Sequence, residues 1–268
     1  TAGRLALDAV LTESADFCTT TQSPTLLAAM RGLKPRIVAD FSRSSREMLV
    51  TANRTKGVTK ATDLKGKKVA TKMGTSGHFF LNQFLALHGM TLKDVEVVNM
   101  GGPEMVTAVV KGDVDAFAWD WLSVIAAQKQ AGDDIVVLDH AGIEKIWGYH
   151  LILVANDKVV QERPDVVEMA VKSLVDAEAF IADSPEKTIG YVAKRTATSL
   201  EDTKKGIGLL DIGVKLDNSL VDVMVAETEW AIAQNISKPY DGDVRVLFRD
   251  AIYPDALAKV APDRVSLS

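Results

Sequence analysis

Short apolar runs that alternate with segments of helical periodicity constrain the fold of this chain more than any other feature. ADFCTTT precedes the helical SPTLLAAMRG, RIVADF precedes the polar SRSSR, and KKVATK precedes a helix that is apolar along one face. The alternation continues through VEVVNM, DAFAW and DIVVLD. This pattern is typical of α/β proteins with mainly parallel sheets, whose ligands bind beyond the carboxyl ends of the strands. We therefore expect an α/β fold with a ligand site in the loops that follow the strands.

Two changes in the pattern predict two lobes. VTANRTKGVTKATDLKGKK is a polar connection rich in Lys and Thr, and after the strand-like GYHLILVAN, which begins near Tyr149, the chain becomes almost wholly helical. We expect the chain to cross between lobes at both places. Residues 1–66 and 149–268 would then form a discontinuous lobe I, and residues 67–148 an inserted lobe II.

Composition and motifs exclude several classes of function. The 268 residues are 47% hydrophobic, enough for a sizeable core, and their net charge of -5 includes no Lys/Arg stripe of the kind that binds nucleic acid. No apolar run approaches the roughly 18 to 20 residues of a membrane span. We find no metal-spaced His or Cys cluster, GxGxxG motif, P-loop or catalytic triad, and so expect no metal, cofactor or catalysis. The start, TAGRLALDAV, suggests a processed or incomplete N-terminus.

The stretch TKMGTSGHFF places two hydroxyls, on Thr75 and Ser76, between two glycines at the start of a helix. The first N–H groups of a helix have no intrahelical partner and carry the positive end of its dipole, so small residues there let an anion approach. An ordinary helix cap, in which a hydroxyl accepts from its own helix, explains the same residues. Both interpretations stay open.

The tripeptide Trp119-Asp120-Trp121 ends a predicted strand. Two indoles offer flat apolar faces and N–H donors, and the carboxylate can hold a cationic or donating part of a ligand. Alternation along a strand predicts both indoles on one side. Alternatively, one Trp lies in the core and Asp120 caps the next helix, ahead of Ser123.

The chain also resembles a known family. ATDLKGKKVATKMGTSGHFFLNQFLALHGMTLKDVEVVNM, followed by VTAVVKGDVDAFAWDWLSVIAAQKQAG, is similar to the NMT1/THI5-like substrate-binding proteins of ABC importers for nitrate, sulfonates, taurine and pyrimidine precursors. The resemblance implies a two-lobe type II periplasmic-binding-protein fold with a two-strand hinge, whose closure traps a ligand between the lobes. Family members usually carry a strand and a helix ahead of the segment that matches Ala2 to Cys18, and we expect these to be missing here.

The family resemblance implies a solute-binding component of an ABC importer: a monomer, periplasmic or extracellular, with or without a lipid anchor, that serves permease subunits. We expect an organic sulfonate or taurine-like zwitterion, because nitrate would leave Asp120 and both indoles unused. A pyrimidine or other heteroaromatic precursor is the alternative. Some relatives of the fold are cysteine-dependent desulfinases, so a Cys18-dependent enzyme is a further alternative, although a lone cysteine at a strand end is more typical of an inert small hydrophobe.

The resemblance predicts ligand-binding residues in the loops that follow four strands. Tyr149, beside the second crossing between lobes, is a further candidate. The predicted contacts are Thr19, Thr20, Gln22, Ser42, Ser44, Thr75, Ser76, His78, Trp119, Asp120, Trp121 and Tyr149. Three of these stretches have a purely structural interpretation as well. CTTTQS fits a turn with a cap at Ser23, SRSSR fits a solvated loop, and His78 fits a solvent-facing or core histidine.

Overall fold

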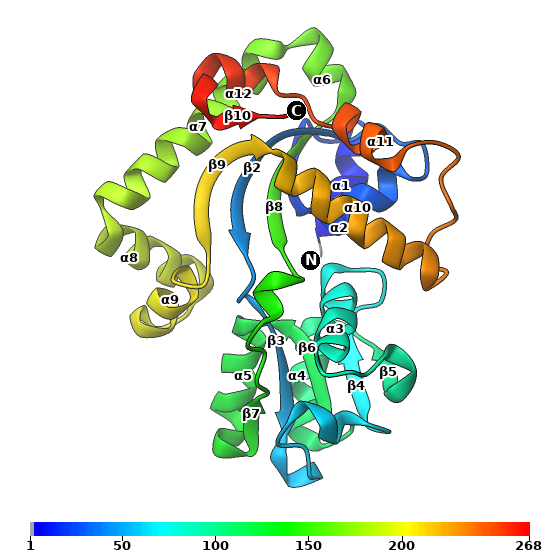
Figure 1. The fold of residues 1–268 in the computed structure, drawn as a ribbon. Helices are drawn as coiled ribbons and strands as arrows, with labels where there is room; N and C mark the ends of the chain where they lie inside the picture. Colours follow the sequence, from blue (N-terminus) through cyan, green and yellow to red (C-terminus); the bar gives the residue numbers. More distant parts are fainter. Residues whose placement is uncertain (1–2) are drawn as a thin grey trace. The chain divides into compact units, whose positions relative to one another are not determined.

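The computed structural model describes residues 3–268, and the chain divides into two compact units (Figure 1). Unit 1 contains the chain up to Ser44, Tyr149–Thr203 and Leu210–Ser268, and unit 2 contains Ser45–Gly148 and Lys204–Leu209. Residues 45–66, which we expected in lobe I, therefore belong to unit 2. The reason is strand pairing, since β3 (Met48–Asn53) pairs with β6 (Ala116–Asp120) and β7 (Ile135–Val137).

Within the described residues, unit 1 is built on a five-stranded sheet in the order β1-β8-β2-β9-β10 (Figure 1). Its strands are β1 (Phe17–Thr21), β8 (Tyr149–Ala155), β2 (Arg36–Ser44), β9 (Asp211–Asp217) and β10 (Val265–Ser266). Strand β8 runs antiparallel to both β1 and β2, β9 is antiparallel to β2, and only the β9–β10 pair is parallel. The expectation of a mainly parallel sheet is therefore wrong here. Strands β1 and β2 are joined through α2 (Gln22–Ala29), but β8, which returns from unit 2, lies between them.

Unit 2 holds a second sheet, in the order β5-β4-β6-β3-β7, which is also five-stranded in the described chain. Strands β4 (Lys68–Thr71), β5 (Glu96–Asn99) and β6 are parallel, as expected, while β3 is antiparallel to β6 and β7. Three helices connect these strands: α3 (Ser76–Leu87), α4 (Gly102–Lys111) and α5 (Trp121–Ala131). The starts of α3 and α5 therefore follow the carboxyl ends of the parallel strands β4 and β6, where ligands bind in such sheets.

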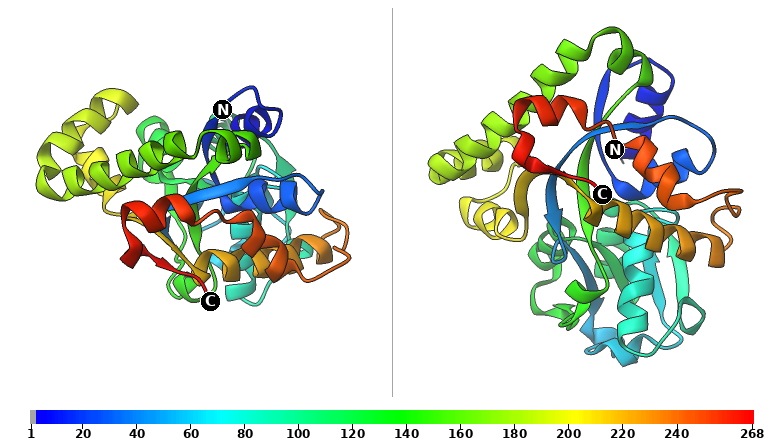
Figure 2. Two further views of the ribbon diagram at one scale, coloured as in Figure 1. Left: turned by 90° about the horizontal axis from the view of Figure 1, so that it is seen from above. Right: turned by 45° about the horizontal axis from the view of Figure 1, so that its top comes forward.

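Helices pack on the sheet of unit 1 and on one another. They are α1 (Gly3–Leu11), α2, α6 (Asp157–Glu162), α7 (Pro164–Asp183), α8 (Pro185–Thr196), α10 (Asn218–Ala233), α11 (Val244–Ala251) and α12 (Asp255–Val260), while α9 (Leu200–Ile207) spans the boundary between the units. Proline starts α7 and α8 because the first position of a helix needs no N–H donor. Figure 2 shows α10 and α11 beside α2, and Met224 and Phe248 bury their side chains in the core there.

Each unit has its own apolar core. That of unit 1 gathers β-strand residues such as Ile37, Ile152 and Val154 with helix residues such as Val167. That of unit 2 joins Phe117 of β6 to residues of α4 and α5. Across residues 3–268, none of the helices is both long and apolar enough to span a membrane.

Candidate functional site

The predicted contacts fall into two groups, one in each unit. In unit 1, the three residues of the β1 end differ in environment. Thr19 is exposed, whereas Thr20 is 3% exposed and its hydroxyl has no hydrogen-bond partner among the described residues. Gln22, the first residue of α2, is fully buried, and its Oε1 accepts from the His150 N–H at 3.0 Å.

Gln22 also hydrogen-bonds to a buried carboxyl that the sequence did not suggest. Glu227, on α10, receives hydrogen bonds from the side chains of Ser23 and Gln22. Burial nevertheless raises the pKa of Glu227 to about 8, because the charged form loses its hydration. At neutral pH this carboxyl is therefore mostly protonated.

The end of β2 carries a second cluster of buried polar groups. Ser42 and Ser44 are both buried, and Ser44 is the cross-strand partner of the half-buried Tyr149. The hydroxyl of Ser42, like that of Thr20, makes no hydrogen bond within residues 3–268. A buried hydroxyl without a partner is costly, and a bound water or ligand is one way in which native proteins satisfy such a group.

Behind Ser42, a buried aspartate binds two basic side chains. Oδ2 of Asp40 lies 2.7 Å from Nδ1 of His150 and 2.7 Å from Nη2 of Arg43. Sequence reasoning missed this arrangement, although an Asp inside the apolar run RIVADF was a signal, since a carboxylate is almost never fully buried unless it is paired.

In unit 2, the start of α3 does not have the hydroxyl cap that Thr75 could have supplied, and the ligand site stays a prediction. Thr75 is the N-cap residue, yet its hydroxyl does not cap the helix and donates to the Lys72 carbonyl at 2.6 Å. Ser76 and His78 are buried. Nδ1 of His78 accepts from the Gly74 N–H at 3.3 Å, and burial lowers the pKa of this imidazole to about 4. The imidazole is therefore neutral at physiological pH, with its proton on Nε2.

Trp119 packs against the first turns of two helices. A Cβ atom on Gly77, in α3, would lie 2.6 Å from Cε3 of the indole, and one on Gly102, in α4, would lie 2.9 Å from Nε1. Both positions therefore need glycine to let the ring approach. The half-buried indole of Trp119 lies beside the starts of α3 and α4, where the first N–H groups of a helix have no partner in the preceding turn.

The other two members of the Trp-Asp-Trp stretch have separate environments. Asp120 caps α5 by accepting from the Ser123 N–H at 2.8 Å, as the structural interpretation predicted. Trp121 is not a strand residue but the first residue of α5, and its ring packs on Gly206. The prediction that alternation puts both indoles on one side is therefore wrong, because β6 ends at Asp120.

Asp120 lies next to a carboxyl that sequence reasoning missed. Burial raises the pKa of Asp120, and burial followed by the charge of Asp120 raises the pKa of Glu47 to about 8. Glu47 is placed there by its backbone, whose carbonyl accepts from the Trp121 N–H at 3.1 Å. The two carboxyls together carry less negative charge at neutral pH than two free carboxylates would.

Cys18 lies in the apolar core of unit 1, opposite Val154 of β8. Burial raises the pKa of its thiol to about 11, so the reactive thiolate is scarce at neutral pH. No group of three or more His, Cys, Asp or Glu side chains in the described chain is arranged to hold a metal ion.

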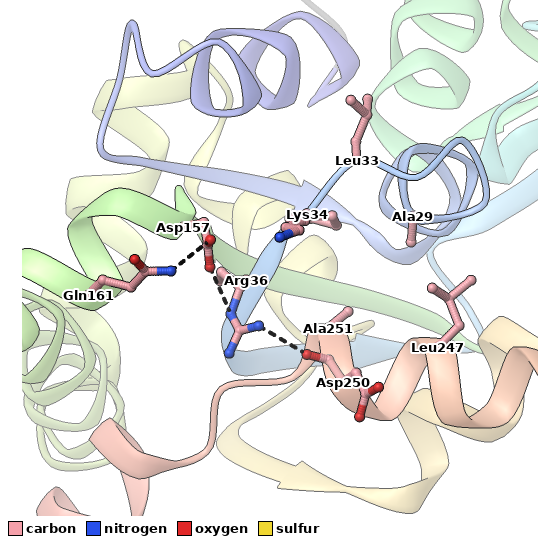
Figure 3. Close-up of a pocket in the computed structure, with 10 residues that line it drawn as sticks. Ala29, Leu33, Lys34, Arg36, Asp157, Gln161, Leu247, Asp250 and Ala251 are labelled. Atoms are coloured by element: carbon pink, nitrogen blue, oxygen red, sulfur yellow. Dashed lines mark hydrogen bonds and ion pairs between the residues drawn. The ribbon is translucent and has the colours of Figure 1, made fainter.

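A pocket of about 310 Å³ lies in another part of unit 1 (Figure 3). It is lined by Ala29, Leu33, Lys34, Pro35, Arg36, Asp157, Gln161, Leu247, Asp250 and Ala251. Figure 3 shows Arg36 between Asp157 and the backbone carbonyl of Asp250. The lining includes none of the predicted contacts, so this pocket is separate from both groups.

Comparisons with known proteins agree on the class of protein. The family model described as NMT1/THI5 like matches residues 2–188. A protein of Brucella abortus described as a binding protein is 29% identical over 162 residues, which are 60% of this chain and 50% of that protein. The taurine-binding periplasmic protein of Escherichia coli is 25% identical over 166 residues, which are 61% of this chain and 50% of that protein. The chain thus aligns with about half the length of these curated relatives.

Solved structures show the same fold. The periplasmic aliphatic sulphonate-binding protein of Escherichia coli has a TM-score of 0.79 at 19% identity, over 94% of this chain and 80% of that one. The alkanesulfonate-binding protein of Xanthomonas axonopodis pv. citri, solved with MOPS, has a TM-score of 0.79 at 20% identity, over 94% and 85%. A desulfurization enzyme has a TM-score of 0.66 at 16% identity, over 93% and 86%. The fold is therefore the α/β fold of periplasmic binding proteins.

Proposed function

The chain belongs to the NMT1/THI5-like family, and from that premise we propose that it is the solute-binding component of an ABC importer, with an organic sulfonate or taurine-like zwitterion as its solute. The relatives named for taurine and for sulfonates support this class of solute. A periplasmic location and delivery to permease subunits are parts of the same proposal. Capture by hinge closure also stays a prediction.

The observation that carries the proposal is that Thr20 and Ser42, two predicted contacts of unit 1, each bury a hydroxyl. Both were predicted as contacts, and neither has a hydrogen-bond partner in the part of the chain that the structure describes. A sulfonate oxygen would accept a hydrogen bond from either donor. A nitrate ion would also accept from such donors, so the ranking of organic sulfonates first and heteroaromatic precursors second rests on the solutes for which the relatives are named.

A desulfinase-like enzyme is the competing proposal, because a desulfurization enzyme shares the fold. It would need a reactive cysteine, and Cys18 is buried with a pKa of about 11. The close relatives are named as binding proteins. We therefore propose a binding protein and not an enzyme.

A thermal-shift screen tests the proposed solute. The panel contains taurine, ethanesulfonate, an amino-pyrimidine, nitrate and bicarbonate, and a ligand at 100 times its Kd stabilises the folded state by about 2.7 kcal/mol. We expect the sulfonates to raise the melting temperature most. Thr20→Val and Ser42→Ala should weaken this response without loss of stability, because each removes a hydroxyl that has no partner in the free protein. If only nitrate raises the melting temperature, and does so equally in Thr20→Val and Ser42→Ala, the proposal is wrong.

A further inference from the structure

A buried arginine with unused hydrogen-bond donors lies among the predicted contacts of unit 1. Arg43 lies in β2 between Ser42 and Ser44, but its side chain is on the opposite face, with that of its cross-strand partner His150, and only 17% of it is exposed. Its Nε and Nη2 atoms are buried, and neither makes a hydrogen bond to any described residue. Nη2 lies 2.7 Å from Oδ2 of Asp40, so this contact is an ion pair without hydrogen-bond geometry.

Two of the acids near Arg43 are paired with cations. Asp40 is fully buried, and its Oδ2 is shared with His150. Asp217 forms an ion pair with Lys215. Burial opposes ionisation of Asp217, but its hydrogen bond with Lys215 and the charge of Arg43 help to lower its pKa to about 2. Two carboxylates thus face two permanent cations, and the exposed Asp211, the cross-strand partner of Arg43, adds a third carboxylate.

From this geometry we infer that Arg43 is the specificity-determining residue that binds the anionic group of the solute through its Nε–H and Nη2–H. A guanidinium presents these two donors in parallel, at a spacing that matches two oxygens of a carboxylate or sulfonate. An arriving anion would satisfy the donors that Asp40 leaves unused. This inference rests on the proposed function and identifies the group that reads the charge of the solute.

A purely structural role for Arg43, as the counter-ion of Asp40, is the alternative, and matched variants separate the two. Asp40→Asn/Arg43→Gln removes both charges together, so no buried carboxylate loses its cation. Arg43→Lys keeps the ion pair but lacks the paired N–H donors. The control is Arg36→Gln, since Arg36 lies in the same strand, also has a buried Nε without a hydrogen-bond partner in the described chain, and contacts Asp157 and Asp250 in the separate pocket (Figure 3).

Isothermal titration with ethanesulfonate and with the neutral ethanesulfonamide gives the readout, and urea unfolding reports stability. We expect the wild-type protein to prefer the sulfonate. Both Arg43 variants should bind the sulfonate about 10- to 100-fold more weakly, the range for a hydrogen bond to a charged group, and lose less affinity for the sulfonamide, whose oxygens are neutral acceptors. Arg36→Gln should match the wild type.

Two results would overturn the inference in distinguishable ways. If Arg43→Lys or the double variant keeps the wild-type preference for the sulfonate, Arg43 does not read the charge and only this inference fails. If the wild-type protein binds neither taurine nor any other organic anion, the proposed function fails first. Should the double variant not fold, Arg43→Lys alone decides the first of these outcomes.

Discussion

At the scale of single residues, Glu227 couples the stability of the protein to pH. Its pKa is about 8 in the folded chain, against an ordinary value of 4.5, because burial disfavours the charged form. Between these two values the unfolded chain has released this proton and the folded chain still holds it. The contribution of Glu227 to stability is therefore fully present below about pH 4.5 and is lost as the pH rises through about 8.

Replacing Glu227 with glutamine tests this coupling. Glu227→Gln keeps the shape of the side chain but cannot ionise, so its free energy of unfolding should fall less than that of the wild type between about pH 5 and about pH 9. Urea denaturation at several pH values measures the difference. Glu229→Gln, on the exposed side of the same helix, should follow the wild type. Equal slopes for Glu227→Gln and the wild type would contradict the prediction.

At the scale of elements, the start of α3 depends on the fit between a glycine and an indole. Gly77→Ala places a Cβ atom 2.6 Å from the ring of Trp119, so the ring or the helix must move. We expect a loss of about 1–3 kcal/mol in the free energy of unfolding, the usual cost of overpacking. A change in the fluorescence of Trp119 should accompany it.

A second helical glycine provides the control. A Cβ atom on Gly190, inside α8, would meet no atom within 4 Å beyond its own helix, so Gly190→Ala should stabilise the protein by about 0.5–1 kcal/mol. Adding Trp119→Leu to Gly77→Ala should recover part of the loss, because the smaller side chain makes room. If Gly77→Ala stabilises the protein as much as Gly190→Ala, the indole of Trp119 leaves room for a Cβ atom at position 77, and the prediction is wrong.

At the scale of the whole molecule, strand order decides which parts of the chain can fold alone. All five strands of the second sheet lie within residues 48–137, so a fragment of residues 45–148 should unfold cooperatively, as followed by circular dichroism during heating. A fragment of residues 1–44 should stay unfolded, because β1 and β2 pair with β8 and not with each other. A featureless melting curve for residues 45–148 would show that unit 2 needs the rest of the chain.

The sequence by itself determined the class of fold and many local elements. Apolar runs with helical periodicity between them marked β4, β5 and β6 and the helices α3, α4 and α5, because the strand period of two and the helix period of 3.6 are local properties. Motifs at strand ends also marked Trp119, Thr20 and Ser42 as candidate ligand contacts. The family pattern pointed to the class of binding protein.

Only the tertiary structure decided which distant segments meet. Strand β8 lies between β1 and β2, and this placement brings His150 to Asp40, 110 positions earlier in the chain. The partners of an isolated Asp or Arg depend on such non-local pairings, which no local period encodes. The apolar run around Asp40 could indicate a paired carboxylate, but neither the identity of its partners nor the burial of Glu227 could be read from the sequence. The same holds for Trp119 and Trp121, whose indoles find different neighbours because the strand ends between them.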